Sequence, residues 1–264
     1  MKTEQFSPGT FSWVDLATTD AEAAKRFYCE LFGWTAEDMP TDAGNDYTML
    51  QLDGDLVCAL WQMQGEMKSQ GIPPHWQSYI TVDDVDAMAD KAAKLGATIA
   101  MPPMDVMTAG RMAVIQDPTG AMVALWQKKD HGGAQRVNEP ESFCWNELQT
   151  RDIAKAEAFY GELFGWTTNH NESPMGGVYV EIRHNDRPAG GMLPIRPEWG
   201  DVPSHWGVYF AVADCDAALK KATGLGAKGL MPPVDIPGTG RFVMLQDPQG
   251  AVFSVIALES PDGA

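Results

Sequence analysis

The stretch that decides the fold is Arg26-Phe27-Tyr28-Cys29-Glu30-Leu31-Phe32-Gly33-Trp34, because residues 158–166 repeat it as Ala158-Phe159-Tyr160-Gly161-Glu162-Leu163-Phe164-Gly165-Trp166. In the first copy, Phe27, Leu31 and Trp34 recur at the spacing of one helix face, which predicts the end of an amphipathic helix. The glycine before the tryptophan can adopt the left-handed conformation that often terminates helices. A helix that ends in this way twice predicts a duplicated structural unit.

The repeat extends along most of the chain, and Trp13, for example, has its counterpart at Trp145. We therefore predict two similar domains, at residues 8–128 and 140–260. The linker between them, residues 129–139, contains charges and a glycine pair without hydrophobic periodicity. These features predict an exposed connection.

Each copy contains the same order of elements twice. Residues 11–16 alternate between apolar side chains and the mixed pair Trp13 and Asp15, which predicts a half-buried strand. Thr19-Asp20 then supplies a helix cap, and three short strand patterns follow the helix. The same order begins again at residue 77. We therefore predict an α+β fold made of four βαβββ units with mostly antiparallel strands.

Composition limits the class of protein. The chain has 264 residues, a formal net charge of −17 and a calculated pI near 4.5, which argue against nucleic acid and anionic membranes as partners. It contains no apolar run of bilayer-spanning length and no apolar signal region at its start. The four cysteines lack metal or redox spacing. We expect reduced, mostly buried thiols in a cytoplasmic protein, either a monomer or a homodimer.

Further short motifs accompany these elements in both copies. They are Val14-Asp15-Leu16, Val82-Asp83-Asp84 and Asp117-Pro118-Thr119-Gly120 in the first copy, and Glu147-Leu148, Val212-Ala213-Asp214 and Asp247-Pro248-Gln249-Gly250 in the second. With the opening stretch, they resemble the vicinal oxygen chelate superfamily, which includes glyoxalase I, bleomycin-resistance proteins, fosfomycin-resistance enzymes and extradiol dioxygenases. The resemblance covers nearly the whole chain. It implies two half-open barrels, each with a concave cavity on one face and helices on the other.

Strand alternation then predicts which side chains face each cavity. They are Trp13, Asp15, Tyr47, Met49, Gln51, Gln77, Tyr79, Ala124 and Trp126 in the first copy, and Trp145, Glu147, Tyr179, Glu181, Arg183, Gly207, Tyr209, Ser254 and Ile256 in the second. Because Glu181 and Arg183 replace Met49 and Gln51, we expect the second cavity to be the more polar. The alternative is that this charged pair lies on a solvated rim.

Metal-dependent members of the superfamily hold their metal through His or Glu on the concave face. The resemblance carries three of these positions to Trp13, Gln77 and Ala124 in the first copy and to Trp145, Gly207 and Ser254 in the second. Neither copy keeps a His/Glu set, and an indole N–H can only donate. We therefore expect no cofactor. The alternative is a divalent metal (Ni, Zn, Fe or Mn) held by displaced ligands, His75 and His205.

The histidines, and the two arginines that each follow a glycine, have structural interpretations as well as functional ones. We expect His75 and His205 to bond to nearby backbone at the start of a strand, with metal ligation as the alternative, and we expect His131, His170 and His184 to be solvated. Arg111 and Arg241 either form a polar contact that closes the strand-turn-strand corner near Asp117 and Asp247, or clamp an anion at the cavity mouth.

Two carboxylates are the candidates for catalysis. Asp15 and Glu147 each lie two residues after a cavity tryptophan, and burial would shift the pKa of such a group toward that of a general base. Pairing with an arginine or tyrosine on the same face is the alternative. The tryptophans Trp13, Trp126 and Trp145 could stack on a flat ligand or fill the space of the missing metal.

The sequence therefore favours a small-molecule-binding protein of the glyoxalase and bleomycin-resistance type, with a ligand in the cavity of each half. The alternative is a glyoxalase-like lyase or isomerase, or a hydroxylase, that uses a carboxylate base or a non-standard metal site. A scaffold for protein interactions fits the mixed aromatic and polar cavity face less well. The predicted ligand-binding residues are Trp13, Tyr47, Gln77, Tyr79, Arg111, Trp126, Trp145, Tyr179, Glu181, Arg183, Tyr209 and Arg241.

Overall fold

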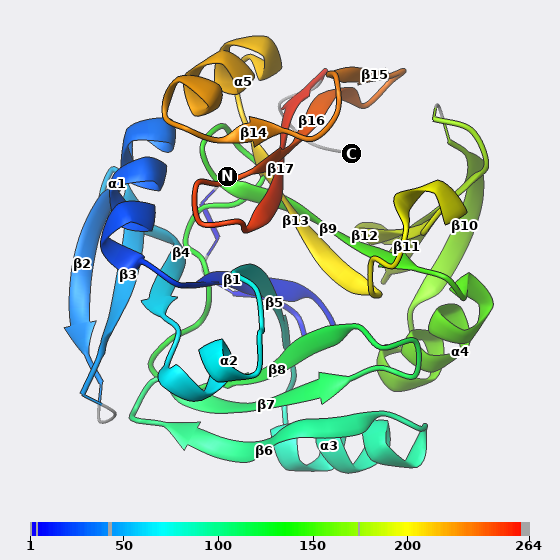
Figure 1. Cartoon of the computed structure of the whole chain (residues 1–264). Coiled ribbons are helices and arrows are strands. Elements are labelled where there is room, and N and C mark those ends of the chain that lie inside the picture. Colours follow the sequence, from blue (N-terminus) through cyan, green and yellow to red (C-terminus); the bar gives the residue numbers. More distant parts are fainter. Residues whose placement is uncertain (1, 4, 42–43, 174, 260–264) are drawn as a thin grey trace.

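The computed structural model describes residues 2–3, 5–41, 44–173 and 175–259, and each copy of the repeat forms its own sheet (Figure 1). In the first copy the strands are β1 (Phe11–Thr18), β2 (Thr35–Pro40), β3 (Asp46–Leu52), β4 (Asp55–Gln62), β5 (His75–Thr81), β6 (Thr98–Val106), β7 (Gly110–Gln116) and β8 (Met122–Lys128), and the helices are α1 (Ala21–Phe32), α2 (Gly65–Ser69) and α3 (Val85–Lys94).

In the second copy the strands are β9 (Phe143–Thr150), β10 (Thr167–Glu172), β11 (Val178–His184), β12 (Arg187–Pro194), β13 (His205–Ala211), β14 (Lys228–Gly229), β15 (Val234–Ile236), β16 (Gly240–Gln246) and β17 (Val252–Leu258), and the helices are α4 (Ile153–Phe164), the 3-10 helix η1 (Pro197–Trp199) and α5 (Cys215–Gly224). Within the described ranges, no helix is both long and apolar enough to cross a bilayer.

The two sheets have the same topology. The first has the strand order β2-β3-β4-β1-β5-β8-β7-β6, and the second has the order β10-β11-β12-β9-β13-β17-β16-β14, with β15 paired to β16. In each unit the first and last strands pair in parallel, as β1 does with β4 and β5 with β8. The two units meet through an antiparallel pair, β1 with β5 and β9 with β13. The predicted α+β fold of tandem βαβββ units in open, curled sheets is confirmed.

The opening motif forms the helix end that its sequence predicts. In α1, the Asp20 carboxylate accepts a hydrogen bond from the backbone N–H of Ala23, and Gly33 ends the helix with φ 74°. The second copy repeats both features, with Asp152 as the cap and Gly165 at φ 73°. The two helices therefore begin and end by the same local chemistry.

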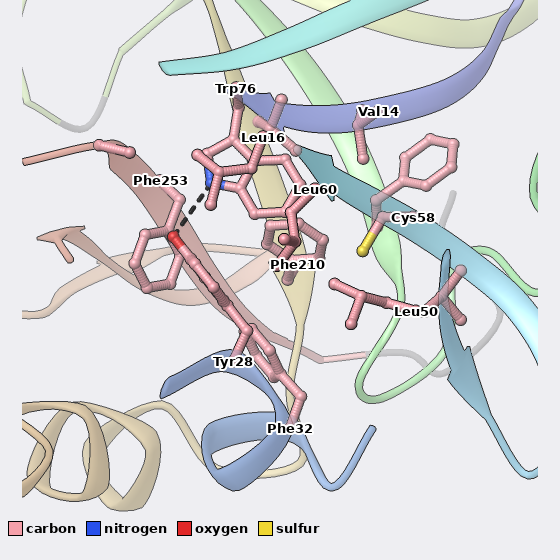
Figure 2. Close-up of a cluster of buried hydrophobic side chains, with 14 of the residues drawn as sticks. Val14, Leu16, Tyr28, Phe32, Leu50, Cys58, Leu60, Trp76, Phe210 and Phe253 are labelled. Carbon is pink, nitrogen blue, oxygen red and sulfur yellow. Dashed lines mark hydrogen bonds between the residues drawn. The ribbon is translucent and has the colours of Figure 1, made fainter. Parts of the chain in front are cut away.

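The two large hydrophobic clusters are shared between the copies, whereas a smaller one, around Tyr209, Phe242 and Ile256, belongs to the second copy. In one cluster, side chains of α1 and the first sheet pack against Phe210 and Phe253 of the second copy (Figure 2). The ring centroids of Tyr28 and Phe253 lie 5.4 Å apart, and those of Phe32 and Phe210 lie 5.3 Å apart. The other cluster joins α3, β5 and β8 of the first copy to α4 of the second. As a result, α1 lies beside α5 and α3 lies beside α4 (Figure 1).

The tyrosine of the repeated motif connects the two copies in both directions. Tyr28 Oη donates to Asp247 Oδ2 at 3.0 Å, and Tyr160 Oη donates to Asp117 Oδ2 at 2.8 Å. In each aspartate the other oxygen accepts backbone N–H groups of its own turn, such as that of Ala251 onto Asp247 at 2.8 Å. One carboxylate thus shapes a turn in its own copy and holds a helix of the other copy.

Two local predictions are wrong because neighbouring segments cover surfaces that were expected to be open. The strand β1 is buried on both faces, not half-buried, since the concave face of the first copy is also filled. The linker, expected to be exposed, packs across that copy: Ala134 and Val137 are buried, and the Ala134 N–H donates to Ser12 O at 2.8 Å. The cysteines are free thiols, with Cys58 and Cys215 buried.

We predict that Tyr28→Phe lowers the free energy of unfolding by about 1–3 kcal/mol, because it leaves a buried carboxylate oxygen of Asp247 without its donor. Tyr160→Phe should have a similar effect through Asp117. Urea unfolding monitored by circular dichroism measures both. Thr223→Val, which removes an exposed hydroxyl of α5, is the control and should change stability by less than about 0.5 kcal/mol. Equal, small effects of all three substitutions would contradict a structural role for the tyrosine–aspartate contacts.

Candidate functional site

Both cavities contain the same network of tryptophan, tyrosine and carboxylate. In the first copy, Trp13 Nε1 donates to Tyr47 Oη at 2.9 Å, and the hydroxyls of Tyr47 and Tyr79 donate to Asp15 Oδ2 at 2.8 and 2.7 Å. Alternate residues of β1, β3 and β5 thus meet on the concave face, as strand alternation predicts. Gln77 lies opposite Asp15 on β5, half-buried, and donates to the backbone oxygen of Ser78.

The second copy repeats the network around Glu147. Trp145 Nε1 donates to Tyr179 Oη at 2.8 Å, and Tyr209 Oη donates to Glu147 Oε1 at 3.0 Å. Gln149 adds a longer hydrogen bond of 3.4 Å to the same oxygen. Gln149 corresponds to Ala17 of the first copy. Gln149 pairs with Leu193 of β12, just as Ala17 pairs with Trp61 of β4.

Burial dominates the electrostatics of both networks. Asp15 is 1% exposed and Glu147 is 4% exposed. Burial raises the pKa of Asp15, while hydrogen bonds from Tyr79, Tyr47 and Trp61 act in the opposite direction. Burial likewise raises the pKa of Glu147, opposed by hydrogen bonds from Tyr209, Gln149 and Tyr179. Both carboxyl groups are therefore buried, which favours their neutral form, and both accept hydrogen bonds, which favour their charged form.

The first cavity is filled by its own side chains. Trp61 Nε1 donates to Asp15 Oδ1 at 3.3 Å, so that both carboxylate oxygens have donors. Trp126 Nε1 donates to the backbone oxygen of His131 at 2.9 Å, and the His131 ring centroid lies 4.5 Å from that of Trp13. Trp13, Tyr79 and Trp126 consequently belong to the large core cluster.

The second half instead contains a cavity of about 1100 Å³. Its walls include Trp145, Glu147, Tyr179, Tyr209 and Phe242, and it extends to the N-terminal segment at Phe6 and Phe11. Two exchanges explain the space. Leu193 stands where the first copy has Trp61, and Ile256 stands where it has Trp126, as the strand registers show. The counterpart of His131 falls at residues 260–264, outside the described residues.

Charged residues also distinguish the second cavity. Glu181 lines it, and Arg183 Nη1 bonds to Glu181 Oε1 at 2.6 Å. Both side chains are about a quarter exposed, at 26% and 28%. The pair thus lies at the rim, where the two charges satisfy each other. The first copy has Met49 and Gln51 at these positions, so the second concave face carries charge that the first lacks.

The two arginines do not stand at the cavity mouths, and they do not close the corners near Asp117 and Asp247. Arg111 Nε bonds to Asp86 of α3 at 2.7 Å, and Arg241 Nε bonds to Asp216 of α5 at 2.9 Å. The reason is strand alternation. Arg111 pairs with Gln127 of β8, so the two side chains lie on the same face of the sheet. The Gln127 side chain accepts a hydrogen bond from the backbone N–H of Val85 at the start of α3, so this face is the helix side.

The five histidines lie in three kinds of surroundings. His75 and His205 each bond through Nδ1 to a proline carbonyl two residues earlier, at 2.9 Å, as expected for a histidine at the start of a strand. The exposed His170 bonds to Glu157 at 2.6 Å. The prediction that His131 and His184 are solvated is wrong: His131 covers the first cavity, and His184 lines the second, with its ring against Gly9.

The residues at the superfamily's metal positions do not fit a metal ion. An indole nitrogen carries hydrogen and offers no lone pair to a metal, and in both networks its N–H donates to a tyrosine oxygen. The other positions carry Gln77 and Ala124, or Gly207 and Ser254. In the part of the chain that the structure describes, no group of three or more His, Cys, Asp or Glu side chains could hold a metal.

Sequence reasoning missed the residues that decide which cavity is open. Trp61 lies two positions after Ala59 on β4, so alternation could have assigned it to the concave face and its counterpart Leu193 to the second cavity. The contributions of His131 and the N-terminal segment carry no periodic signal. They depend on how chain segments outside the sheets pack.

Comparison with known proteins agrees with this geometry. A family model described as the Glyoxalase/Bleomycin resistance protein/Dioxygenase superfamily matches residues 10–125 and 142–255. The chain belongs to this superfamily, and each of its halves carries one such domain. It is 45% identical over 256 residues to "Putative glyoxylase CFP32" of Mycobacterium tuberculosis, with 97% of each chain covered. It is 38% identical over 265 residues to "Anthracycline biosynthesis protein DauV" of Streptomyces sp. (strain C5), with 96% of this chain and 95% of that one covered.

Solved structures share the fold at low sequence identity. The Mn(II)-bound glyoxalase from Novosphingobium aromaticivorans has a TM-score of 0.66 and 16% identity, covering 95% of this chain and 82% of that chain. The 2,3-dioxygenase LapB from Pseudomonas sp. KL28 has a TM-score of 0.64 and 15% identity, covering 99% and 97%. These likenesses concern the fold alone.

We predict that His131 makes stability depend on pH. Burial lowers the pKa of His131 from 6.5 to about 4, so the unfolded chain binds the proton more readily. The stability gained from neutral His131 is complete above pH 6.5 and is lost as the pH falls toward 4, by about 2–3 kcal/mol. Urea unfolding from pH 7.5 to 4.5 should show this loss in the unmodified protein and a smaller one in His131→Phe. The difference at pH 7.5 reports packing alone and is the reference. If the free energy of unfolding depended on pH in the same way in both proteins, His131 would not be buried in its neutral form.

Proposed function

We propose that this chain binds a flat aromatic small molecule in the cavity of its second half. One observation carries the proposal: both halves keep the Trp–Tyr–carboxylate network, but Leu193 and Ile256 in the second stand where Trp61 and Trp126 fill the first. The first half therefore has its own side chains in the space that the second half leaves for a ligand. This revises the expectation of one ligand in each half.

The dimensions and lining of the cavity support such a ligand. Pockets for small molecules are mostly apolar, with a few polar groups that fix orientation, and commonly measure about 300–1,000 Å³. Here Trp145, Phe242 and Ile256 supply the apolar walls, and Glu147 and the two tyrosine hydroxyls supply the polar groups. The Streptomyces relative is named for anthracycline biosynthesis, and anthracyclines are aromatic molecules. The net charge of −17 disfavours nucleic acid and anionic membranes as partners.

We propose further that binding requires no metal ion or other cofactor. The side chains at the superfamily's metal positions support this, because the indoles of Trp13 and Trp145 donate to tyrosines and the neighbouring positions lack a ligand set. The ligand would be held by stacking, apolar contact and hydrogen bonds alone.

A second candidate function is acid–base catalysis by Glu147 on the bound molecule. The observation that favours it is a carboxyl group with a raised pKa in the wall of a cavity, which is typical of general bases. The two functions differ in one measurement. An enzyme with Glu147→Gln would stop converting its substrate, whereas a binding protein would convert nothing in either form.

We predict that Leu193→Trp removes ligand binding by filling the second cavity as Trp61 fills the first. With 2-naphthol as the probe, titration followed by isothermal calorimetry should show at least a tenfold loss of affinity. Leu230→Trp is the matched control, because Leu230 is 47% exposed and lies outside the cavity lining. It should bind the probe as the unmodified chain does. Equal affinity in all three proteins would place the binding elsewhere and contradict the proposal.

We also predict that purified protein shows no saturable sub-micromolar site for Ni²⁺, Zn²⁺, Fe²⁺ or Mn²⁺ in calorimetric titrations. The reason is that, among the residues that the structure describes, neither concave face presents a set of His and Glu ligands. A stoichiometric site that is lost on His75→Ala or His205→Ala would support the displaced-ligand alternative instead.

A further inference from the structure

The first half shows what an occupant of this type of cavity looks like. The indole of Trp61 enters from β4, fills the space beside the network and places its N–H 3.3 Å from Asp15 Oδ1. The tyrosines Tyr47 and Tyr79 take the other oxygen, Oδ2. The occupant is therefore a flat aromatic system with one hydrogen-bond donor aimed at the buried carboxylate.

The second half has the same carboxylate but lacks this occupant. Leu193 stands at the position of Trp61 and can donate no hydrogen bond. Tyr209 and Gln149 both donate to Glu147 Oε1, and the bond from Gln149, at 3.4 Å, is at the weak end of hydrogen-bond lengths. The Glu147 carboxyl also lines the open cavity. A molecule in the cavity can thus reach the carboxyl of Glu147, whose counterpart Asp15 in the first half has the indole N–H of Trp61 as a donor on its second oxygen.

We propose that the ligand of the second cavity is a hydroxyaryl compound whose phenolic O–H donates to Glu147, in the place that the Trp61 N–H takes in the first half. This inference rests on the proposed binding function and names the chemical class of its ligand. Glu147 is then the residue that determines specificity, and the aromatic ring of the ligand lies against the walls formed by Trp145 and Phe242.

The direction of the surrounding hydrogen bonds favours a donor over an acceptor on the ligand. Trp145 donates to the Tyr179 oxygen, so the Tyr179 proton is free to point toward Glu147, and Tyr209 donates to Glu147 directly. Every neighbour of the carboxyl is thus a donor, and an ionised carboxylate can only accept. A carboxylate out of water is costly unless its oxygens are satisfied, which a phenolic O–H achieves.

The charges around the cavity also disfavour an anionic group beside Glu147. Glu147, Glu172 and Glu181 line the cavity, and Arg183 at the rim is bonded to Glu181, whereas Arg187 of the lining is an exposed residue. The carboxylate or phosphate of an aromatic ligand placed beside the buried Glu147 would therefore meet a group of like charge. A neutral phenol avoids this repulsion, which is consistent with the acidic character of the whole chain.

Three probes of nearly equal shape test the proposal: 2-naphthol, which donates; 2-methoxynaphthalene, which does not; and 2-naphthoate, which is anionic. Isothermal calorimetry at pH 7.5 should give 2-naphthol at least a tenfold higher affinity than either of the others. This comparison uses the unmodified chain and needs no variant. In Glu147→Gln the preference for 2-naphthol over 2-methoxynaphthalene should fall to about twofold or less, because a neutral amide is a weaker acceptor.

Glu157→Gln is the matched control, because Glu157 bonds to Thr168 and His170 away from the cavity. It should keep the full preference. Equal affinity for 2-naphthol and 2-methoxynaphthalene would overturn the donor inference while leaving the binding function in place. A preference for 2-naphthol that survives in Glu147→Gln would overturn the role of Glu147. If no probe binds and Leu193→Trp changes nothing, the binding function itself is contradicted, which is a separate outcome.

Discussion

The structure depends on a pair of reciprocal hydrogen bonds between the halves, from Tyr28 to Asp247 and from Tyr160 to Asp117. Each aspartate also binds backbone N–H groups of its own turn, so the same carboxylate determines a turn in one copy and the position of a helix in the other. Around these contacts, each of the two large hydrophobic clusters takes helices and strands from both copies. The repeated motif therefore stabilises the pair of domains rather than either domain alone.

This arrangement leaves the concave faces free to differ. The contacts of α1 with α5 and of α3 with α4 lie on the helix side of the sheets, opposite the concave faces. The first cavity holds Trp61, Trp126 and the linker residue His131. The second keeps Leu193 and Ile256 in place of the tryptophans and remains open to a ligand. A duplicated fold can thus contain one closed and one open site.

The buried carboxylates connect the fold to the proposed function. Burial raises the pKa of Asp15 and of Glu147, and the surrounding tyrosines oppose this shift by donating hydrogen bonds. In the first half, Trp61 completes the set of donors around Asp15. In the second half, a ligand can do the same for Glu147. Under the proposed function, hydrogen bonding between aromatic groups and a carboxylate takes the place of the superfamily's metal chemistry. Trp13 and Trp145 stand at metal positions of the superfamily, and their N–H groups donate to tyrosines.

The sequence by itself determined the duplication, the βαβββ order and the faces of the strands, because these depend on helix caps, glycine stops and the two-residue period of a strand. It also placed the network residues Trp13, Tyr47, Asp15 and Tyr79 on one concave face. Only the tertiary structure decided which cavity is open, and it placed Arg111 and Arg241 on the helix side and His131 over the first cavity. Those outcomes depend on contacts between segments far apart in the chain, such as the linker packing across β1, and no local period encodes such contacts.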